Sequence, residues 1–516
     1  MRQSQAMIPS IYRLIGLSIM LLLLTSCTNM PKQPPPQTKY ACSQDLHSGD
    51  AISILEASLK ESEFLAVHRG DDALRWLLTI ADNAQQTLDV QYYIWKNDAS
   101  GALLVDHLLD AADRGVKVRV LLDDFHLAGR DEGGILFNSH PNIELKVFNP
   151  LSVRSSRWAF RGLELLFNLP RLNHRMHNKL FVADREIGLL GGRNIGDEYF
   201  GISDHLSFRD LDLVARGPIA EDISSSFDSY WHSTWSYRID GLDTTRVNPE
   251  ELKNARRKLK ARIAQAVALN NEFQLSKAGW KNRPAKQAEH FIKGHARVVY
   301  DCPPSDDTGR PTQVAQVLGE LAASTEDDLF IISPYLVPKE SLRSGLRTLI
   351  DRGVSIKILT NSLESSDSAA AVSGYARHRP ELLHMGVDLY EMRGKPDNPD
   401  LFETPSADTD FISLHAKTII FDHDSLYVGS LNLDPRSLEL NTEIGLLIHS
   451  PELSEQIRST FELELKPESS WHVLLNEEGQ ARWHSSIGVR NSTPARNLWQ
   501  RFSTFIYSLL PIEDQL

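Results

Sequence analysis

The sequence predicts an α/β protein made of two similar domains that pack with pseudo-two-fold symmetry around one site at their interface. Three observations favour this fold class. A His-x-Lys-x-x-x-x-Asp pattern occurs twice, a longer repeat surrounds both copies, and each copy is preceded by segments in the order strand, helix, strand. That order is typical of βαβ units, so we expect a largely parallel sheet in each domain.

The repeat keeps its register from the first strand pair of each half to the motif. The segment RGVKVRVLLDD starts at Arg114 and resembles RGVSIKILTNS, which starts at Arg352. The offset of 238 (352 − 114) also separates His415 from His177 (415 − 177). Self-similarity over such a length indicates a duplicated structural unit. In each half we expect an apolar strand (LDVQYYIW; LFIISPYLVP), a helix that ends in Arg-Gly, and a second strand.

The first motif copy fits a β-strand. His177 and Lys179 are two residues apart, so their side chains emerge on the same face, while the apolar residues after the lysine continue the strand into a buried sheet. We expect Asp184 to end this strand, and Gly191 and Gly192 to form a turn that brings the chain back toward the same pocket.

The second copy, with His415, Lys417 and Asp422, repeats this spacing. Ten residues after each aspartate stands an asparagine, Asn194 and Asn432. One such pattern arises often by chance, but two copies with the same tail make coincidence implausible. Two histidines that share one phosphate indicate phosphoryl transfer, with an imidazole as nucleophile or general acid and Lys and Asn holding phosphate oxygens.

The duplicated motif resembles the phospholipase D superfamily, and the resemblance covers about residues 88–450. The stretches MHNKLFVAD, GGRNIGDEYF and NLDPRSLELNTEIG are more similar to bacterial cardiolipin synthases than to nucleases or secreted phospholipases, and SGYARHRPELL is similar to the C type. The resemblance implies two phospholipase D-type domains and the synthesis of cardiolipin without a cofactor or metal. Phosphatidylglycerol would be the acceptor, and phosphatidylglycerol or phosphatidylethanolamine the donor.

By the same analogy, His177 attacks the phosphorus and forms a phosphatidyl-histidine. His415 protonates the departing alcohol and then acts as base on the incoming hydroxyl. The lysines and asparagines of both motifs would position the phosphate oxygens.

Five further residues have roles that only the analogy suggests. Asp210 in FRDLD and Glu443 in NTEIG follow their histidines by 33 and 28 residues (210 − 177; 443 − 415), and they would orient the imidazoles. Asp184 and Asp422 are either catalytic or, as we favour, turn-forming carboxylates that do not touch phosphate. Arg436 in DPRS contacts a headgroup or braces its loop, and both readings stay open.

Length and charge fit a two-domain protein that acts on lipid. The 516 residues leave room for two domains with appendages. The net charge is −13, and removal of a signal containing Arg2 and Arg13 would take it to −15, which disfavours a nuclease because nucleic-acid binding rests on basic surfaces. Hydrolysis to phosphatidic acid and a non-catalytic lipid-binding lipoprotein remain alternatives, although two complete His-Lys pairs argue against the second. A soluble activating partner is left open.

The N-terminus predicts a lipoprotein of the bacterial cell envelope. The apolar run Leu14–Leu24 is short for a spanning helix and leads into Leu-Thr-Ser-Cys, which resembles a lipobox. We expect residues 1–26 to be a signal peptide and Cys27 to carry the lipid anchor, including palmitate, with an uncleaved anchor as the alternative. Thr28 predicts sorting to the outer membrane, facing the periplasm. Residues 27–40 read as a proline-rich tether.

Two cysteines then remain, Cys42 and Cys302, and we expect a disulfide between them, with two free thiols as the alternative. The expected boundaries are a first domain at 41–240, a polar basic insertion at 241–295, a second domain at 296–470, and a hairpin with an amphipathic helix at 471–516.

Three segments can be interpreted as contacts to a membrane surface. Trp158–Leu172 is apolar and aromatic, with a buried helix as the alternative, and the basic stretch Leu252–Ile263 reads first as a solvated linker helix and second as a contact to anionic lipid. We expect the C-terminal helix to dock at a membrane interface, because little chain follows to cover its apolar residues, Trp499, Phe502, Ile506 and Leu509.

Overall fold

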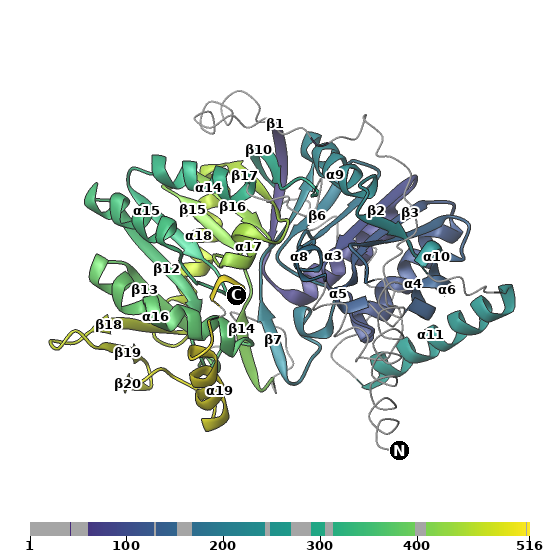
Figure 1. Cartoon of the computed structure of the whole chain (residues 1–516). Helices are drawn as coiled ribbons and strands as arrows, with labels where there is room; N and C mark the ends of the chain where they lie inside the picture. The colour runs from purple at the N-terminus through teal and green to yellow at the C-terminus, as the bar shows by residue number, and fades with distance from the viewer. Residues whose placement is uncertain are drawn as a thin grey trace, which may run out of the picture.

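The computed structural model describes residues 42, 60–127, 131–151, 168–242, 248–269, 290–304, 313–397, 409–511 and 513–515. Two mixed α/β halves lie beside each other, the first drawn in purple to teal and the second in green to yellow (Figure 1). The expected signal peptide, the tether with Cys27, and residues 158–167 of the apolar segment before the first motif lie outside the described residues.

Among its described residues, the first half contains nine strands: β1 (Lys60–Val67), β2 (Thr87–Tyr92), β3 (Lys117–Asp123), β4 (Ile143–Phe148), β5 (Leu180–Ala183), β6 (Ile187–Gly191), β7 (Leu206–Arg209), β8 (Asp212–Arg216) and β9 (Ser236–Arg238). Its described helices are α3 (Gly70–Asn83), α4 (Ala99–Asp113), α5 (Asp124–Leu127), α6 (Asp131–Asn138), α8 (Leu169–Leu172), α9 (Pro218–Trp231), α10 (Ile239–Leu242) and α11 (Pro249–Leu269).

The second half repeats this order with β10 (Ile292–Tyr300), β11 (Asp328–Ile332), β12 (Ser355–Asn361), β13 (Asp388–Met392), β14 (Phe411–Leu414), β15 (Thr418–Phe421), β16 (Ser425–Gly429) and β17 (Ile444–His449). The predicted hairpin is formed by β18 (Ser470–Leu475) and β19 (Ala481–Ser485), and a third antiparallel strand, β20 (Gly488–Arg490), pairs with β19. The described helices are α14 (Gln313–Ser324), α15 (Glu340–Asp351), α16 (Ala369–Met385), α17 (Pro435–Glu439), α18 (Pro451–Glu464) and α19 (Leu498–Ser508).

The predicted strand, helix, strand units are present in both halves. In the first half, α4 connects β2 to β3. Asp98 caps its N-terminus by accepting the N–H of Gly101, and Arg114 is its C-cap residue. In the second half, α15 connects β11 to β12, and Arg352 is its C-cap residue. Val118 and Val120 of β3 are buried, as expected for a strand that helices cover.

The prediction of a largely parallel sheet was wrong, because the sheets are mixed. The pairs β2–β3, β3–β4, β11–β12 and β12–β13 are parallel, but the motif strands and their neighbours β6, β8, β16 and β17 pair antiparallel. After the first motif the chain reverses at once, with positive φ at Asp184 (54°) and Arg185 (59°). Such a short turn permits only an antiparallel return. Gly191, expected in a turn, is the last residue of β6.

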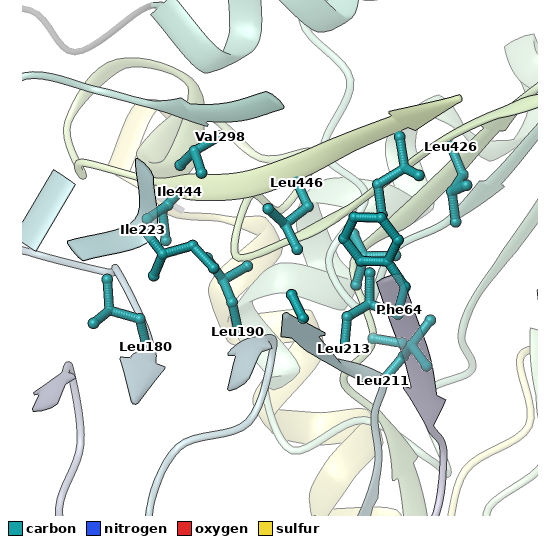
Figure 2. Packing of buried hydrophobic residues seen from close by; sticks show 14 of the residues in the cluster. Phe64, Leu180, Leu190, Leu211, Leu213, Ile223, Val298, Leu426, Ile444 and Leu446 are labelled. Atoms are coloured by element: carbon teal, nitrogen blue, oxygen red, sulfur yellow. The ribbon is translucent and has the colours of Figure 1, made fainter. Parts of the chain in front are cut away.

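One sheet runs through both halves. Strand β1 pairs with β8 on one side and with β10 on the other, and β10 pairs with β17. Side chains from both halves share one core, where Leu190 and Leu213 pack with Val298 and Leu446 (Figure 2). A separate parallel pair, β7 with β14, also crosses between the halves. The interface is therefore part of the hydrophobic core and not a loose contact between domains.

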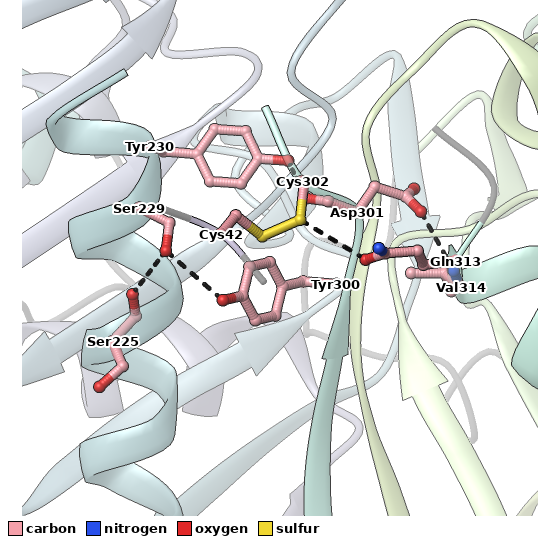
Figure 3. The surroundings of a disulfide bond; sticks show 9 residues. All are labelled: Cys42, Ser225, Ser229, Tyr230, Tyr300, Asp301, Cys302, Gln313 and Val314. Carbon is pink, nitrogen blue, oxygen red and sulfur yellow. Dashed lines mark hydrogen bonds between the residues drawn. A yellow bond between two sulfur atoms is a disulfide. The ribbon is translucent and has the colours of Figure 1, made fainter. Parts of the chain in front are cut away.

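A disulfide joins Cys42 to Cys302, with the two Cα atoms 5.7 Å apart (Figure 3). Cys302 follows the end of β10, so the bond fastens the chain before the first half to the second half. This is the pairing that the sequence suggested.

The basic stretch and the C-terminal segment predicted from the sequence form a helix and a hairpin followed by a helix. The basic stretch 252–263 lies in α11, which packs on α4, and Arg256 forms an ion pair with Asp113 (2.9 Å). The hairpin β18–β19 turns at Gly479, where φ is +74°, and α19 follows it. None of the helices described here has the length and apolar character that a membrane crossing needs.

Candidate active site

Each motif histidine is held by the backbone of the opposite half. The N–H of His177 donates to the carbonyl of Thr442 (2.9 Å), and the N–H of His415 donates to the carbonyl of Arg209 (2.7 Å). The second contact follows from the β7–β14 pair, in which Leu414 lies opposite Arg209. These backbone hydrogen bonds bring the two motifs, which are distant in sequence, into one site.

The imidazoles take their carboxylates from the opposite half as well. Nδ1 of His177 lies 2.8 Å from Oε2 of Glu443, and Nδ1 of His415 lies 2.5 Å from Oδ2 of Asp210. Asp210 and Glu443 are thus bound to the imidazoles as the sequence suggested, but each contacts the histidine of the other half and not the one that it follows in sequence. The physical reason is that each acid directly follows a backbone contact with the other half. Asp210 comes after β7, which pairs with β14, and Glu443 comes after Thr442, which forms a β-bridge with Met176.

An acceptor on Nδ1 leaves the Nε2 atom of each imidazole available for a substrate. Burial is the main cause that lowers the pKa of His415 to about 3, and Lys417 acts in the same direction. Burial likewise lowers the pKa of His177 well below its usual value. The lowered pKa values favour the neutral form of both rings, with Nδ1–H donated to the carboxylate.

The motif lysines are fully enclosed. Nζ of Lys179 donates to the carbonyl of His177 (2.5 Å), and Nζ of Lys417 donates to that of His415. Burial lowers the pKa of Lys179 to about 7 and that of Lys417 to about 8, and it raises the pKa of Glu443 to about 7. A buried anion such as a phosphodiester would stabilise both ammonium groups.

Aromatic side chains line both imidazoles. Tyr93 meets His177 edge-on, with ring centroids 5.2 Å apart, and Tyr199 meets His415 in the same way at 5.2 Å. Phe208 lies 4.9 Å from the ring of His415. Since His177 is only 7% exposed and His415 6%, water has little access to either ring.

The motif aspartates Asp184 and Asp422 lie at turns, and their carboxylates accept backbone N–H groups. The carboxylate of Asp184 accepts the N–H groups of Gln85, Gln86 and Thr87 at 2.7 to 2.8 Å, where β2 begins. That of Asp422 accepts the equivalent amides at the start of β11. Both residues have positive φ, 54° and 49°. These contacts support the structural interpretation that we favoured, and a catalytic role for either aspartate stays a prediction.

The two asparagines differ in their contacts. Asn194 accepts the N–H of Ile94 (3.2 Å) and donates to the hydroxyl of Tyr199 (3.0 Å), so it braces the end of β2. Oδ1 of Asn432 is buried and has no hydrogen-bond partner among the described residues. A phosphate contact from either amide stays a prediction.

Arg436 spans the two halves. Its guanidinium donates to Oδ1 of Asn173 (2.6 Å) and to the backbone carbonyls of Asn173 (3.3 Å) and Gln515 (3.4 Å). In this structure the arginine therefore braces the interface, and a headgroup contact stays a prediction.

Two residues that support Glu443 were missed by the sequence analysis. The hydroxyl of Ser430 donates to Oε2 of Glu443, and the buried carboxylate of Asp301 accepts its backbone N–H (2.9 Å). The internal repeat could have indicated Ser430, because it stands 238 residues after Gly192 (430 − 192) and so occupies the equivalent position in the second half. A Cβ atom at Gly192 would lie only 2.2 Å from Oδ1 of Asp210, so the first half leaves room where the second half adds a donor.

Comparisons with known proteins agree with this architecture. The family described as "Cardiolipin synthase, PLD-like domain" matches residues 77–231 and 318–464, more than half of the chain. Cardiolipin synthase C of Escherichia coli is 36% identical over 456 residues, which cover 86% of this chain and 93% of that protein. Cardiolipin synthase 1 of Bacillus anthracis is 26% identical over 408 residues, with 78% and 67% covered.

A solved structure has a similar fold. Phosphatidylserine synthase of Haemophilus influenzae superposes with a TM-score of 0.58 at 16% sequence identity, and the match covers 90% of this chain and 99% of that one. At this identity the likeness bears on the fold alone.

Proposed function

The chain belongs to the family of phospholipase D-like domains of cardiolipin synthase, and on that basis we propose that it transfers a phosphatidyl group between phospholipids to make cardiolipin. The observation that carries the proposal is the pair of buried histidines, each in contact through Nδ1 with a carboxylate of the other half and flanked by a buried lysine. That arrangement leaves two Nε2 atoms to act on one phosphodiester.

In the first half-reaction, Nε2 of His177 would attack the phosphorus of the donor while His415 protonates the departing headgroup alcohol. The bond from phosphorus to that alcohol breaks, and a bond from phosphorus to Nε2 forms. His415 must carry an additional proton for this step. The phosphodiester anion counters the charges of Lys179 and Lys417, which raises the pKa of His415 relative to the empty site.

In the second half-reaction, His415 has lost that proton and would take one from a hydroxyl of phosphatidylglycerol. The alkoxide oxygen attacks the phosphorus, the bond to Nε2 of His177 breaks, and cardiolipin is released. Phosphatidylglycerol and phosphatidylethanolamine both fit the donor role, because the leaving group in each case is a headgroup alcohol.

Hydrolysis to phosphatidic acid is the competing reaction, since water can capture the same intermediate. The small exposure of both histidines, with Tyr93, Tyr199 and Phe208 around them, favours transfer, because a site that excludes water protects the intermediate.

We also propose that the protein is a lipoprotein anchored through Cys27 in the outer membrane, facing the periplasm. The Leu-Thr-Ser-Cys sequence supports the anchor, and the Cys42–Cys302 disulfide supports an oxidising compartment. Mass spectrometry of the N-terminal peptide tests this: a lipid-modified Cys27 is expected, and an unprocessed N-terminus would contradict it.

The activity test is product analysis in mixed vesicles of phosphatidylglycerol and phosphatidylethanolamine. We expect cardiolipin from the wild type, none from His415→Ala, and wild-type amounts from His449→Ala, a partly exposed histidine of β17. Omitting each lipid in turn identifies the donor. Phosphatidic acid as the sole product would make the enzyme a phospholipase, and no lipid product would contradict the proposal.

A further inference from the structure

The C-terminal helix α19 presents an apolar face to solvent. Leu498 is 83% exposed and Trp499 70%. Together with the two residues after the helix, the face comprises Leu498, Trp499, Phe502, Phe505, Ile506, Leu509 and Leu510, all of them exposed. Soluble proteins rarely expose contiguous apolar patches of this kind unless the patch binds a partner or a membrane.

We propose that this face docks on the surface of a phospholipid bilayer that contains anionic lipid. Residues 496–511 include Arg496 and Arg501 and no acidic residue, although the whole chain carries a net charge of −13. Aromatic and aliphatic side chains beside an exposed Arg501 match an acyl layer bordered by negative headgroups. With eleven residues the helix is too short to span, so it lies in the plane of the interface.

The opposite side of the helix is fixed to the protein. Asn497 caps it by accepting the N–H of Gln500 (2.9 Å), and the side chain of Gln500 donates to the carbonyl of Leu363. The guanidinium of Arg496 donates to the carbonyl of Ser366 (3.0 Å) and lies 3.3 Å from the ring centre of Phe411. The apolar face is therefore presented by a helix that already has its folded position.

The segment that holds the helix also holds the second motif. Asn361 donates to the carbonyl of Leu414 (2.8 Å) and accepts its N–H (2.9 Å), and Leu414 directly precedes His415. Ser365 donates to the side chain of Asn361 (2.9 Å). Helix α19 lies close to the β7–β14 pair that joins the halves (Figure 1). A bilayer docked on α19 would thus be positioned by the same segment that positions a reacting histidine.

This inference rests on the proposed function for the choice of lipid as the partner, since a phospholipid headgroup has to reach the histidines from a bilayer. The test measures whether Trp499 enters the acyl layer of the bilayer, and it does not depend on whether the enzyme makes a lipid product. Full-length protein is mixed with vesicles of phosphatidylglycerol and phosphatidylethanolamine whose acyl chains carry bromine, which quenches tryptophan in the acyl layer. The same measurement is made on Trp499→Phe, which keeps the face apolar.

We expect the wild type to lose a component of tryptophan emission that is absent from Trp499→Phe. Equal quenching in the two proteins would overturn the proposal and leave the face to a protein partner. Cardiolipin made without quenching of Trp499 would refute docking alone, whereas quenching of Trp499 without any lipid product would refute the function alone.

A second set of variants connects docking to turnover. Replacing Phe502, Phe505 and Ile506 together by serine should lower turnover on vesicles roughly tenfold or more, because three of the seven apolar side chains of the face are removed from its centre. Turnover of short-chain phospholipid dissolved as monomers should stay at the wild-type level. The matched control is Leu474→Ser, at an exposed position on β18, which should change neither rate. An equal loss on vesicles and on monomers would contradict the role of α19 in docking.

Discussion

At the scale of single residues, each motif histidine is paired with a carboxylate from the opposite half of the protein. Glu443 serves His177 and Asp210 serves His415, through Nδ1 contacts of 2.8 Å and 2.5 Å. A carboxylate in this position fixes the tautomer and stabilises the imidazolium. Removing its charge should therefore reproduce the defect of removing the histidine that it touches.

This pairing predicts the phenotypes of two conservative variants. Glu443→Gln should resemble His177→Ala, and Asp210→Asn should resemble His415→Ala, each with a loss of about 10²- to 10⁴-fold in turnover. The measurement is a burst assay with a phosphatidyl ester of p-nitrophenol, a leaving group that needs no general acid. If His177 attacks first, Asp210→Asn should release about one equivalent of nitrophenolate and then stall, as His415→Ala does, and Glu443→Gln should release almost none.

The comparison among variants does not depend on which histidine is the nucleophile. If His415 attacks first, both pairs of phenotypes change places together. A Glu443→Gln variant that behaves like His415→Ala would instead show that each carboxylate serves its own half, and it would contradict the geometry.

The same buried groups predict a narrow pH optimum. Glu443, whose pKa is raised to about 7 by burial, loses its charge as the pH falls through that value, and His177 then loses an ionised acceptor. Lys179 and Lys417, with pKa values lowered to about 7 and about 8, lose their charges as the pH rises. We expect kcat/KM, which reports the free enzyme, to fall on both sides of about pH 7 to 8.

The control for this profile is Lys179→Arg, because Lys179, with its pKa at about 7, is the first of the two lysines to lose its charge, and a guanidinium keeps its charge at alkaline pH. Its alkaline limb should lie at higher pH than that of the wild type, while the acid limb stays where it was. A wild-type profile that is flat between about pH 6 and 9 would show that these groups do not titrate in the free enzyme.

At the scale of elements, the motif aspartates connect the end of one strand to the start of another. Asp184→Ala would leave three backbone N–H groups at the start of β2 without their acceptor. We expect a loss of about 1 to 3 kcal/mol in the free energy of unfolding, measured by chemical denaturation. Turnover of the folded enzyme should stay near the wild-type value.

The matched variant is Asp422→Ala, which removes the equivalent acceptor at β11. The two should act alike, because the repeat gives both aspartates the same turn. A loss of turnover without a loss of stability would restore the catalytic reading of these residues.

Elements set by local spacing could be predicted from the sequence, and elements set by long-range pairing could not. The apolar run and the Arg-Gly ends predicted β2, α4 and β3 because their period and caps are local. The antiparallel direction of β6 depends on the turn at Asp184 and Arg185, which resembles many other polar stretches. The partner of Asp210 depends on the pairing of β7 with β14, two strands that lie about two hundred residues apart, and neither strand's own sequence indicates that pairing.

At the scale of the whole molecule, the halves form one unit with one site. Strands β1 and β10 pair directly, the apolar core is shared, and each histidine depends on the opposite half for its backbone contact and its carboxylate. The sequence predicted two domains around a site, and the motif offset was enough for that. It did not predict that neither half holds a complete His-carboxylate pair, because the repeat alone is compatible with two self-sufficient halves.

This dependence predicts the behaviour of a chain divided between α11 and β10, at residue 280. Each fragment expressed alone should be inactive, since each lacks one carboxylate for its histidine. Co-expressed fragments should assemble through β1–β10 and β7–β14 and make cardiolipin. Because Cys42 lies in the first fragment and Cys302 in the second, a non-reducing gel should show them as one band and a reducing gel as two. Cardiolipin synthesis by either fragment alone, under conditions that exclude the other, would refute the crossed site.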